Sequence, residues 1–132
     1  MAERYIEAIG RRKTASARVR ITPAKETTIV VNDKPIEVYF PYATLRRRIE
    51  EVLTTEGVSL GSYMITAKVV GGGISAQADA IRLGIARGLV KEDMDRRIPL
   101  KKQGLLKRDP RAVERKKPGL RKARKSPQWS KR

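Results

Sequence analysis

The spacing of apolar residues changes near the middle of the chain, between residues 62–70 and residues 74–89. In residues 62–70, β-branched and aromatic side chains dominate, which predicts a β-strand. In residues 74–89, apolar side chains recur at three- and four-residue steps, the spacing of one helix face. The glycines between the two segments permit a tight turn and a close approach of helix to strand. We therefore expect a central strand, a structural turn at Gly71, Gly72 and Gly73, and a helix folded back over the sheet, with Ile74, Ala78, Ile81, Ile85 and Leu89 on one face.

Shorter strands are predicted in the N-terminal half, where apolar and polar residues alternate. Residues 4–9 fit a first strand that breaks at Gly10, and residues 11–13 then fit a basic turn. Residues 14–21 follow the period of two that places successive side chains on opposite faces of a sheet. One face of that strand carries Ala15, Ala17, Val19 and Ile21, and the other carries Thr14, Ser16, Arg18 and Arg20.

The next segment mixes a strand, a turn and a helix. Residues 27–31 predict a strand, Asn32 and Asp33 have the chemistry of a turn, and residues 36–39 fit a short extended piece. Between residues 41 and 53 the period becomes helical, with Tyr42, Leu45, Ile49 and Val52 on one stripe.

The C-terminal quarter loses apolar residues as it proceeds. Residues 91–106 predict a short helix or a pair of turns, because Pro99 would interrupt a longer helix. Residues 107–132, which we call the tail, contain only five apolar residues. Such a segment cannot bury enough surface to offset its ordering entropy, so we expect it to be disordered until a polyanion orders it. The expected organisation is a globular body at residues 1–106 followed by the tail.

The charge of the chain favours a polyanionic partner. The 132 residues carry a net charge of +17, and the tail alone holds 12 Lys and Arg against 2 acids. Nucleic acid is the commonest partner of such a field. Residues 11–20 add five basic residues without an acid. Their alternating charges fit either a solvated outer face or an anion-binding surface, and we favour the second interpretation.

Several function classes are disfavoured by composition. The chain has no cysteine and no histidine, which removes disulfides, thiolate metal sites and the usual general base. Asp93 and Asp95 are interpreted as helix-dipole partners rather than metal ligands. No apolar run resembles a signal peptide or a membrane span. We expect no cofactor, no metal, no membrane and no small-molecule substrate, and a location in the cytoplasm or an organellar matrix or stroma.

The glycine turn has an alternative interpretation as a nucleotide site. Residues 71–76 formally fit the dinucleotide-binding fingerprint between a strand and a helix. No second strand ends in an acid about twenty residues later, and no Gly-Lys-Ser/Thr follows. A structural turn is therefore favoured over a nucleotide-dependent enzyme. In a variant of the structural interpretation, backbone N–H groups at the helix start hold an RNA phosphate.

The tail also admits more than one interpretation. A net charge of +10 in 26 residues exceeds what solubility requires, and a membrane-surface segment would need a wider apolar face. Lys and Arg neutralise closely spaced phosphates, so nucleic acid fits best. Trp129 would either stack on a base or pack against a partner protein. A general nucleic-acid-compacting protein remains an alternative to one that prefers its own RNA.

Four blocks of the chain resemble the family of the ninth protein of the small ribosomal subunit, in its bacterial or organellar form. They are residues 5–19 (YIEAIGRRKTASARV); residues 71–73 with 76–77 and the helix to residue 89; residues 108–111 with 113–124; and residues 127–132 (PQWSKR). The resemblance implies a non-enzymatic α+β two-layer sandwich, with a mixed sheet of about four strands, helices on one face and a left-handed βαβ crossover. It also implies a long, extended basic C-terminal tail.

The resemblance further implies the partners and their contact residues. The body should bind ribosomal RNA in the subunit head beside neighbouring proteins, and the tail should reach transfer RNA in the peptidyl site. The residues expected to bind transfer RNA are Ser130, Lys131 and Arg132. The residues expected to bind ribosomal RNA are Arg11, Arg12, Lys13, Thr14, Arg18 and Arg20 in the body, and Arg108, Arg111, Arg115, Lys116, Lys117, Arg121, Lys122, Arg124 and Lys125 in the tail.

Overall fold

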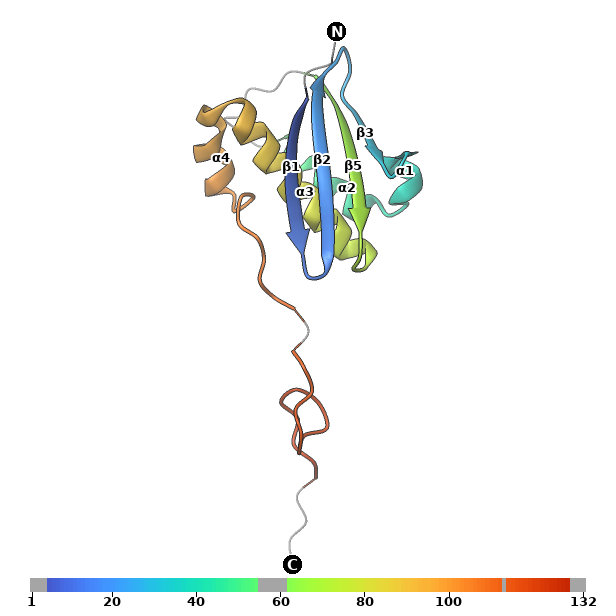
Figure 1. Cartoon of the computed structure of the whole chain (residues 1–132), viewed down its shortest axis with the longest axis vertical. Helices are drawn as coiled ribbons and strands as arrows, with labels where there is room; N and C mark the ends of the chain where they lie inside the picture. Colours follow the sequence, from blue (N-terminus) through green and yellow to red (C-terminus); the bar gives the residue numbers. More distant parts are fainter. Residues whose placement is uncertain (1–4, 55–61, 113, 129–132) are drawn as a thin grey trace, which may run out of the picture.

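The fold is a mixed β-sheet with helices packed on one face (Figure 1). The computed structural model describes residues 5–54, 62–112 and 114–128. The strands are β1 (Ile6–Arg12), β2 (Ala15–Pro23), β3 (Thr28–Val31), β4 (Lys34–Pro35) and β5 (Tyr63–Val70), and their order in the sheet is β1-β2-β5-β3-β4. The helices are α1 (Ile36–Tyr39), α2 (Ala43–Glu50), α3 (Ile74–Glu92), the 3-10 helix η1 (Met94–Arg96) and α4 (Arg97–Lys102).

The sheet has one strand more than predicted, the two-residue β4. Among the strands that the structure describes, β3 and β5 are the parallel pair, with Val30 opposite Thr66, and the other neighbours are antiparallel. The chain between these parallel strands carries α1 and α2. The predicted α+β class and mixed sheet are therefore confirmed, while the left hand of this connection stays a prediction.

The core lies between the sheet and α3. Val19 and Ile65 from the sheet are fully buried, as are Ile81 and Ile85 from the helix. This confirms the predicted alternation in β2 and most of the predicted face of α3. Two predicted core residues are exposed instead. Tyr42 is 61% exposed because it is the extended residue before α2, and Ile74 is 46% exposed because it is the first residue of α3, at the end of the helix.

The first strand is longer than the sequence predicted. β1 continues through Gly10, which pairs with Ala17, and ends at Arg12. Gly10 does not break the strand; it allows contact with α3, because a Cβ there would lie 1.8 Å from the carbonyl oxygen of Ala80. The turn between β1 and β2 is confined to Lys13 and Thr14, and Lys13 has a positive φ of 53°. We call β1, β2 and this turn the hairpin.

The turn after β3 is confirmed, with Asn32 and Asp33 both at positive φ. The side chain of Asn32 continues the sheet beyond the end of the strand. Its Oδ1 accepts from the backbone N–H of Val69 at 2.9 Å, and its Nδ2 donates to the Val69 carbonyl at 3.1 Å. One amide side chain thus satisfies both backbone groups of a β5 residue.

The predicted extended piece at residues 36–39 is wrong, because these residues form the single turn of α1. Pro35 precedes the turn, and Phe40 donates its N–H to the Ile36 carbonyl at 2.8 Å. Folding back in this way buries both Ile36 and Phe40. The short helices predicted in residues 91–106 are confirmed as η1 and α4. Pro99 is the third residue of α4, where a backbone N–H would have no partner within the helix.

Candidate nucleic-acid interface

One face of the sheet is covered by helices, and the other carries a row of cations. We call the cationic face of the sheet the outer face. Figure 1 shows the outer face in front, with α2 and α3 behind the sheet. Arg18 lies between Ile9 of β1 and Lys68 of β5, and Arg20 is the next outward residue of β2. Arg11, Arg18, Arg20 and Lys68 are all exposed. The alternation of β2 therefore presents the predicted basic residues on a common surface.

Large apolar side chains are interspersed among these cations. Tyr5 is 49% exposed, Ile9 42%, Met64 45% and Val70 69%. The guanidinium of Arg20 lies 4.6 Å from the centre of the Tyr5 ring. Apolar surface rimmed by charge is typical of interaction sites, and exposed aromatic rings are the groups on which bases stack.

The outer face also contains a carboxylate that reduces its charge. Glu7 pairs with Arg18 and, at 3.5 Å, with Arg20. Because both arginine side chains are at least 44% exposed, these ion pairs are weak and a phosphate can compete for the same donors. Residues 11–20 contain no acid, but the sheet brings one from the neighbouring strand.

Two of the predicted basic turn residues point in different directions. Arg11 is exposed on the outer face, whereas Arg12 lies on the inner face and is only 9% exposed. Since β1 extends to Arg12, strand alternation separates the two residues. Lys13 and Thr14 form the exposed turn, and the Lys13 carbonyl accepts a hydrogen bond of 3.1 Å from Arg108.

The described basic residues of the tail are exposed. They are Lys107, Arg108, Arg111, Arg115, Lys116, Lys117, Arg121, Lys122, Arg124 and Lys125. Residues 114–128 contain neither helix nor strand, and in Figure 1 the described part of the chain after α4 extends away from the sheet. The described basic residues of the tail therefore lie on the surface, where a polyanion can reach them. Trp129 and the predicted transfer-RNA residues Ser130, Lys131 and Arg132 lie outside the described residues.

Two acids organise the described tail locally. Glu114 accepts hydrogen bonds from Lys117 and, at 2.8 Å, from Arg124, and these bonds lower the pKa of Glu114. Asp109 accepts hydrogen bonds from the Arg111 side chain and backbone, which hold the pKa of Asp109 well below its ordinary value. Both acids are therefore ionised at neutral pH and shape the chain around them.

The glycine turn has a geometric explanation. Gly71 and Gly72 have positive φ angles of 77° and 65°, and a Cβ on Gly71 would lie 2.6 Å from the Thr14 carbonyl oxygen. Gly73 precedes the first residue of α3. Within the described residues no strand follows α3, so the second strand that a dinucleotide site requires is absent there.

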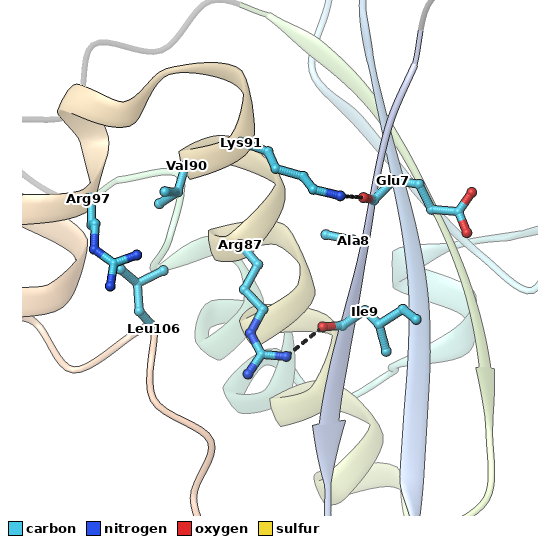
Figure 2. Close-up of a pocket in the computed structure, with 8 residues that line it drawn as sticks. All are labelled: Glu7, Ala8, Ile9, Arg87, Val90, Lys91, Arg97 and Leu106. Atoms are coloured by element: carbon cyan, nitrogen blue, oxygen red, sulfur yellow. Dashed lines mark hydrogen bonds between the residues drawn. The ribbon is translucent and has the colours of Figure 1, made fainter.

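A cleft between β1, α3 and α4 adds cations that sequence analysis did not find. Figure 2 shows Arg87 donating to the Ile9 carbonyl at 2.8 Å and Lys91 donating to the Glu7 carbonyl at 2.9 Å. These bonds pair backbone carbonyl groups on the exposed side of β1, the edge strand of the sheet. The cavity of about 640 Å³ is also lined by Arg97. Neither this cleft nor the place of Lys68 is visible in the sequence, because both depend on which segments the fold brings together.

The described part of the chain contains no group of three or more acidic side chains placed to hold a metal ion. No helix there is both long and apolar enough to cross a membrane.

The fold and this surface define a class of protein: a small basic α+β body with an open cationic sheet face and a polycationic extension. The family model of ribosomal protein S9/S16 matches residues 10–132. The small ribosomal subunit protein uS9 of Synechococcus sp. strain JA-2-3B'a(2-13) is 53% identical over 124 residues, covering 93% of this chain and 90% of that protein. The protein of the same name from Synechococcus sp. strain JA-3-3Ab is 52% identical, covering 93% of this chain and 89% of that protein.

The chain therefore belongs to the S9/S16 family of ribosomal proteins. It is a structural protein of the small ribosomal subunit, and the ribosome is where it acts. The resemblance seen in the sequence is confirmed, and the alternative of a nucleotide-dependent enzyme is wrong.

Proposed function

We propose that this protein binds ribosomal RNA in the head of the small subunit through the outer face and the tail. The observation that carries the proposal is the row of exposed cations on the outer face, with Arg18 beside Lys68 and next to Arg20. Arg and Lys side chains neutralise the phosphates of an RNA backbone, and the counterions of those phosphates are released on binding. Tyr5 and Met64 add apolar contacts for unstacked bases.

The terminal residues extend the proposal to transfer RNA. Ser130, Lys131 and Arg132 end a chain that can span at most about 70 Å beyond Ala112 when fully extended. Such a reach allows the last two cations to bind phosphates of the peptidyl-site transfer RNA while the body stays on ribosomal RNA. Neighbouring proteins of the subunit head would contact the same body. We also propose, from the family resemblance, that the connection from β3 to β5 is left-handed.

The outer face is tested by comparing two triple variants with the same net charge. The first changes Arg18, Arg20 and Lys68 to Gln. The control changes the exposed residues Lys34, Lys101 and Lys102 to Gln. Binding to the head segment of small-subunit ribosomal RNA is measured over a range of salt concentrations.

We expect the outer-face variant to lose roughly 2 units of the slope of log affinity against log salt, at about 0.7 per lost phosphate contact. The control variant should keep most of the slope. Equal slopes in the two variants would contradict the proposal. An unrelated duplex of the same length should bind more weakly than the ribosomal RNA segment, whereas equal affinity would indicate a general nucleic-acid-compacting protein.

The tail is tested by two deletions in reconstituted small subunits. Removing Lys131 and Arg132 should leave assembly intact and speed dissociation of peptidyl-site transfer RNA. Unchanged dissociation rates would refute the role of these residues. Removing residues 108–132 should impair docking on RNA itself, and normal incorporation at moderate salt would count against the role of the tail.

A further inference from the structure

The buried guanidinium of Arg12 connects three parts of the chain. It lies on the inner face at the end of β1, and its Nε is 3.5 Å from Oδ2 of Asp79 on α3. Its Nη1 is 2.9 Å from Oδ1 of Asp109, at the beginning of the tail. Arg12 thus lies between two carboxylates that are thirty residues apart in sequence and come from different segments.

The same guanidinium also binds the backbone of the tail. Its Nη1 donates to the carbonyl oxygens of Asp109 at 3.1 Å and of Arg111 at 2.9 Å. These bonds fix the path of the backbone, and the Asp109 carboxylate holds the guanidinium in the position from which it donates them. Because a buried charge needs partners, removing these acceptors would leave Arg12 poorly satisfied.

Two further contacts fix the same short segment. Asp109 accepts a hydrogen bond of 2.9 Å from the backbone N–H of Arg111, which closes a turn around the two residues. Arg108 donates to the Lys13 carbonyl at 3.1 Å, at the turn of the hairpin. Residues 108–111 are therefore attached to the body at the end of β1, before the exposed part of the tail begins.

We propose that Arg12 is a positioning residue that fixes the direction in which the tail leaves the body, and that it does not itself bind RNA phosphate. This proposal rests on the proposed function, because it concerns how the tail cations are presented to RNA. It assigns Arg11 and Arg12 opposite tasks. Arg11 faces outward to the polyanion, and Arg12 faces inward to hold the beginning of the tail.

The physical consequence is preorganisation. A tail that starts in a fixed direction loses less conformational freedom on binding than one that pivots freely at its base. We call the contacts of Arg12 with Asp109 and Arg111 the junction. Losing the junction should lower the affinity for RNA without changing the number of phosphates neutralised. Losing a direct contact should lower both the affinity and the salt slope.

The first experiment measures the junction in the free protein. The chain has no cysteine, so the substitutions Lys34→Cys and Ala112→Cys, both at exposed positions, provide two sites for spin labels without side reactions. Pulsed electron paramagnetic resonance then gives the distribution of distances between them. The test variants are Arg12→Gln and Asp109→Ala. Their matched controls are Arg11→Gln and Glu114→Ala, which make the same charge changes at exposed positions.

We expect the width of the distribution to at least double in both test variants and to stay unchanged in both controls. Asp109→Ala keeps the test valid if Arg12→Gln fails to fold, because Asp109 lies outside the core. An unchanged width in Asp109→Ala would overturn the proposal. The double variant should broaden the distribution little more than the worse single one, because both changes break one contact network.

The second experiment measures affinity for the ribosomal RNA segment over a range of salt concentrations. Arg12→Gln should weaken binding roughly threefold to tenfold at every salt concentration, the loss expected when one or two groups must be reordered. Its salt slope should equal that of the unaltered protein, whereas Arg11→Gln should lower the slope by about 0.7. Equal reductions of the slope in the two variants would show that Arg12 binds phosphate and would overturn the proposal. If the unaltered protein fails to bind this RNA, the proposed function fails, while the distance measurement still decides the junction.

Discussion

Replacing Gly10 with alanine is expected to destabilise the fold by about 3 kcal/mol, because β1 and α3 touch through their backbones at this residue. A Cβ on Gly10 would lie 1.8 Å from the Ala80 carbonyl oxygen and 2.4 Å from the backbone nitrogen of Gly84. Ordinary contacts at such a carbon lie at 3.4–4 Å. Strand and helix would therefore have to separate by roughly 1.6 Å to restore an ordinary contact.

The size of the expected loss depends on which atoms the new Cβ would overlap. Overpacking a core costs about 1–3 kcal/mol when side chains can shift. The upper end applies here because the overlapped atoms of Ala80 and Gly84 both belong to the backbone. Separation would also loosen the contacts of Val19 and Ile81, which are fully buried. Alanine loses less backbone entropy on folding than glycine does, and this gain offsets only about 0.5–1 kcal/mol of the loss.

Two glycines of α3 provide matched comparisons. A Cβ on Gly84 would lie 2.6 Å from a methyl of Val19 and 3.3 Å from the Gly10 nitrogen, so some strain remains. A Cβ on Gly88 would come closer than ordinary contact only to Cδ1 of Ile21, at 2.7 Å, and that atom is the end of a flexible side chain. Alanine gains about 1 kcal/mol over glycine inside a helix. We therefore expect Gly84→Ala to cost about 1 kcal/mol and Gly88→Ala to be close to neutral.

Urea unfolding followed by far-UV circular dichroism measures these differences. Urea is preferred to guanidinium because a salt would screen the repulsion among the excess cations. The shift of the midpoint at constant slope gives the change in the free energy of unfolding. A loss below 1 kcal/mol for Gly10→Ala, or equal losses in all three variants, would refute the proposed backbone contact.

Two further predictions concern the turn after β3 and the beginning of the tail. Asn32→Ala should reduce the free energy of unfolding by about 2 kcal/mol, measured in the same assay, because it leaves the backbone of Val69 unpaired and places alanine at positive φ; a change below 0.5 kcal/mol would contradict this reasoning. The lowered pKa of Asp109 means that its ion pairs contribute stability above the ordinary value of 3.8 and lose it only as pH falls through the lower folded-state value. Carbon-13 shifts of the carboxyl group should therefore report an ionised Asp109 at pH 3.8, and Arg111→Gln should move its titration back towards that value; a half-protonated group in the unaltered protein would show the reasoning to be wrong.

The local elements were largely predictable because their periodicities are local. The alternation of residues 14–21 and the helical spacing after Gly73 depend only on neighbouring residues, and both were confirmed. The helix at residues 36–39 was not predictable in this way. Ile36 and Phe40 are buried only because the chain folds back beside β3, and a four-residue segment has no periodicity to reveal this.

The sequence by itself determined the charge of the protein, the polar character of the tail and the family to which the chain belongs, since these depend on residue identity alone. The tertiary structure decided which of the basic residues face outward. In the sequence Gly10 is interpreted as the end of the first strand, but the structure shows that it allows β1 to contact α3. Because β1 continues to Arg12, Arg11 and Arg12 lie on opposite faces of the sheet. Lys68 and Arg18 likewise share a surface only through the register of β2 and β5. Direction and neighbourhood arise from contacts between distant segments, and a one-dimensional pattern does not contain them.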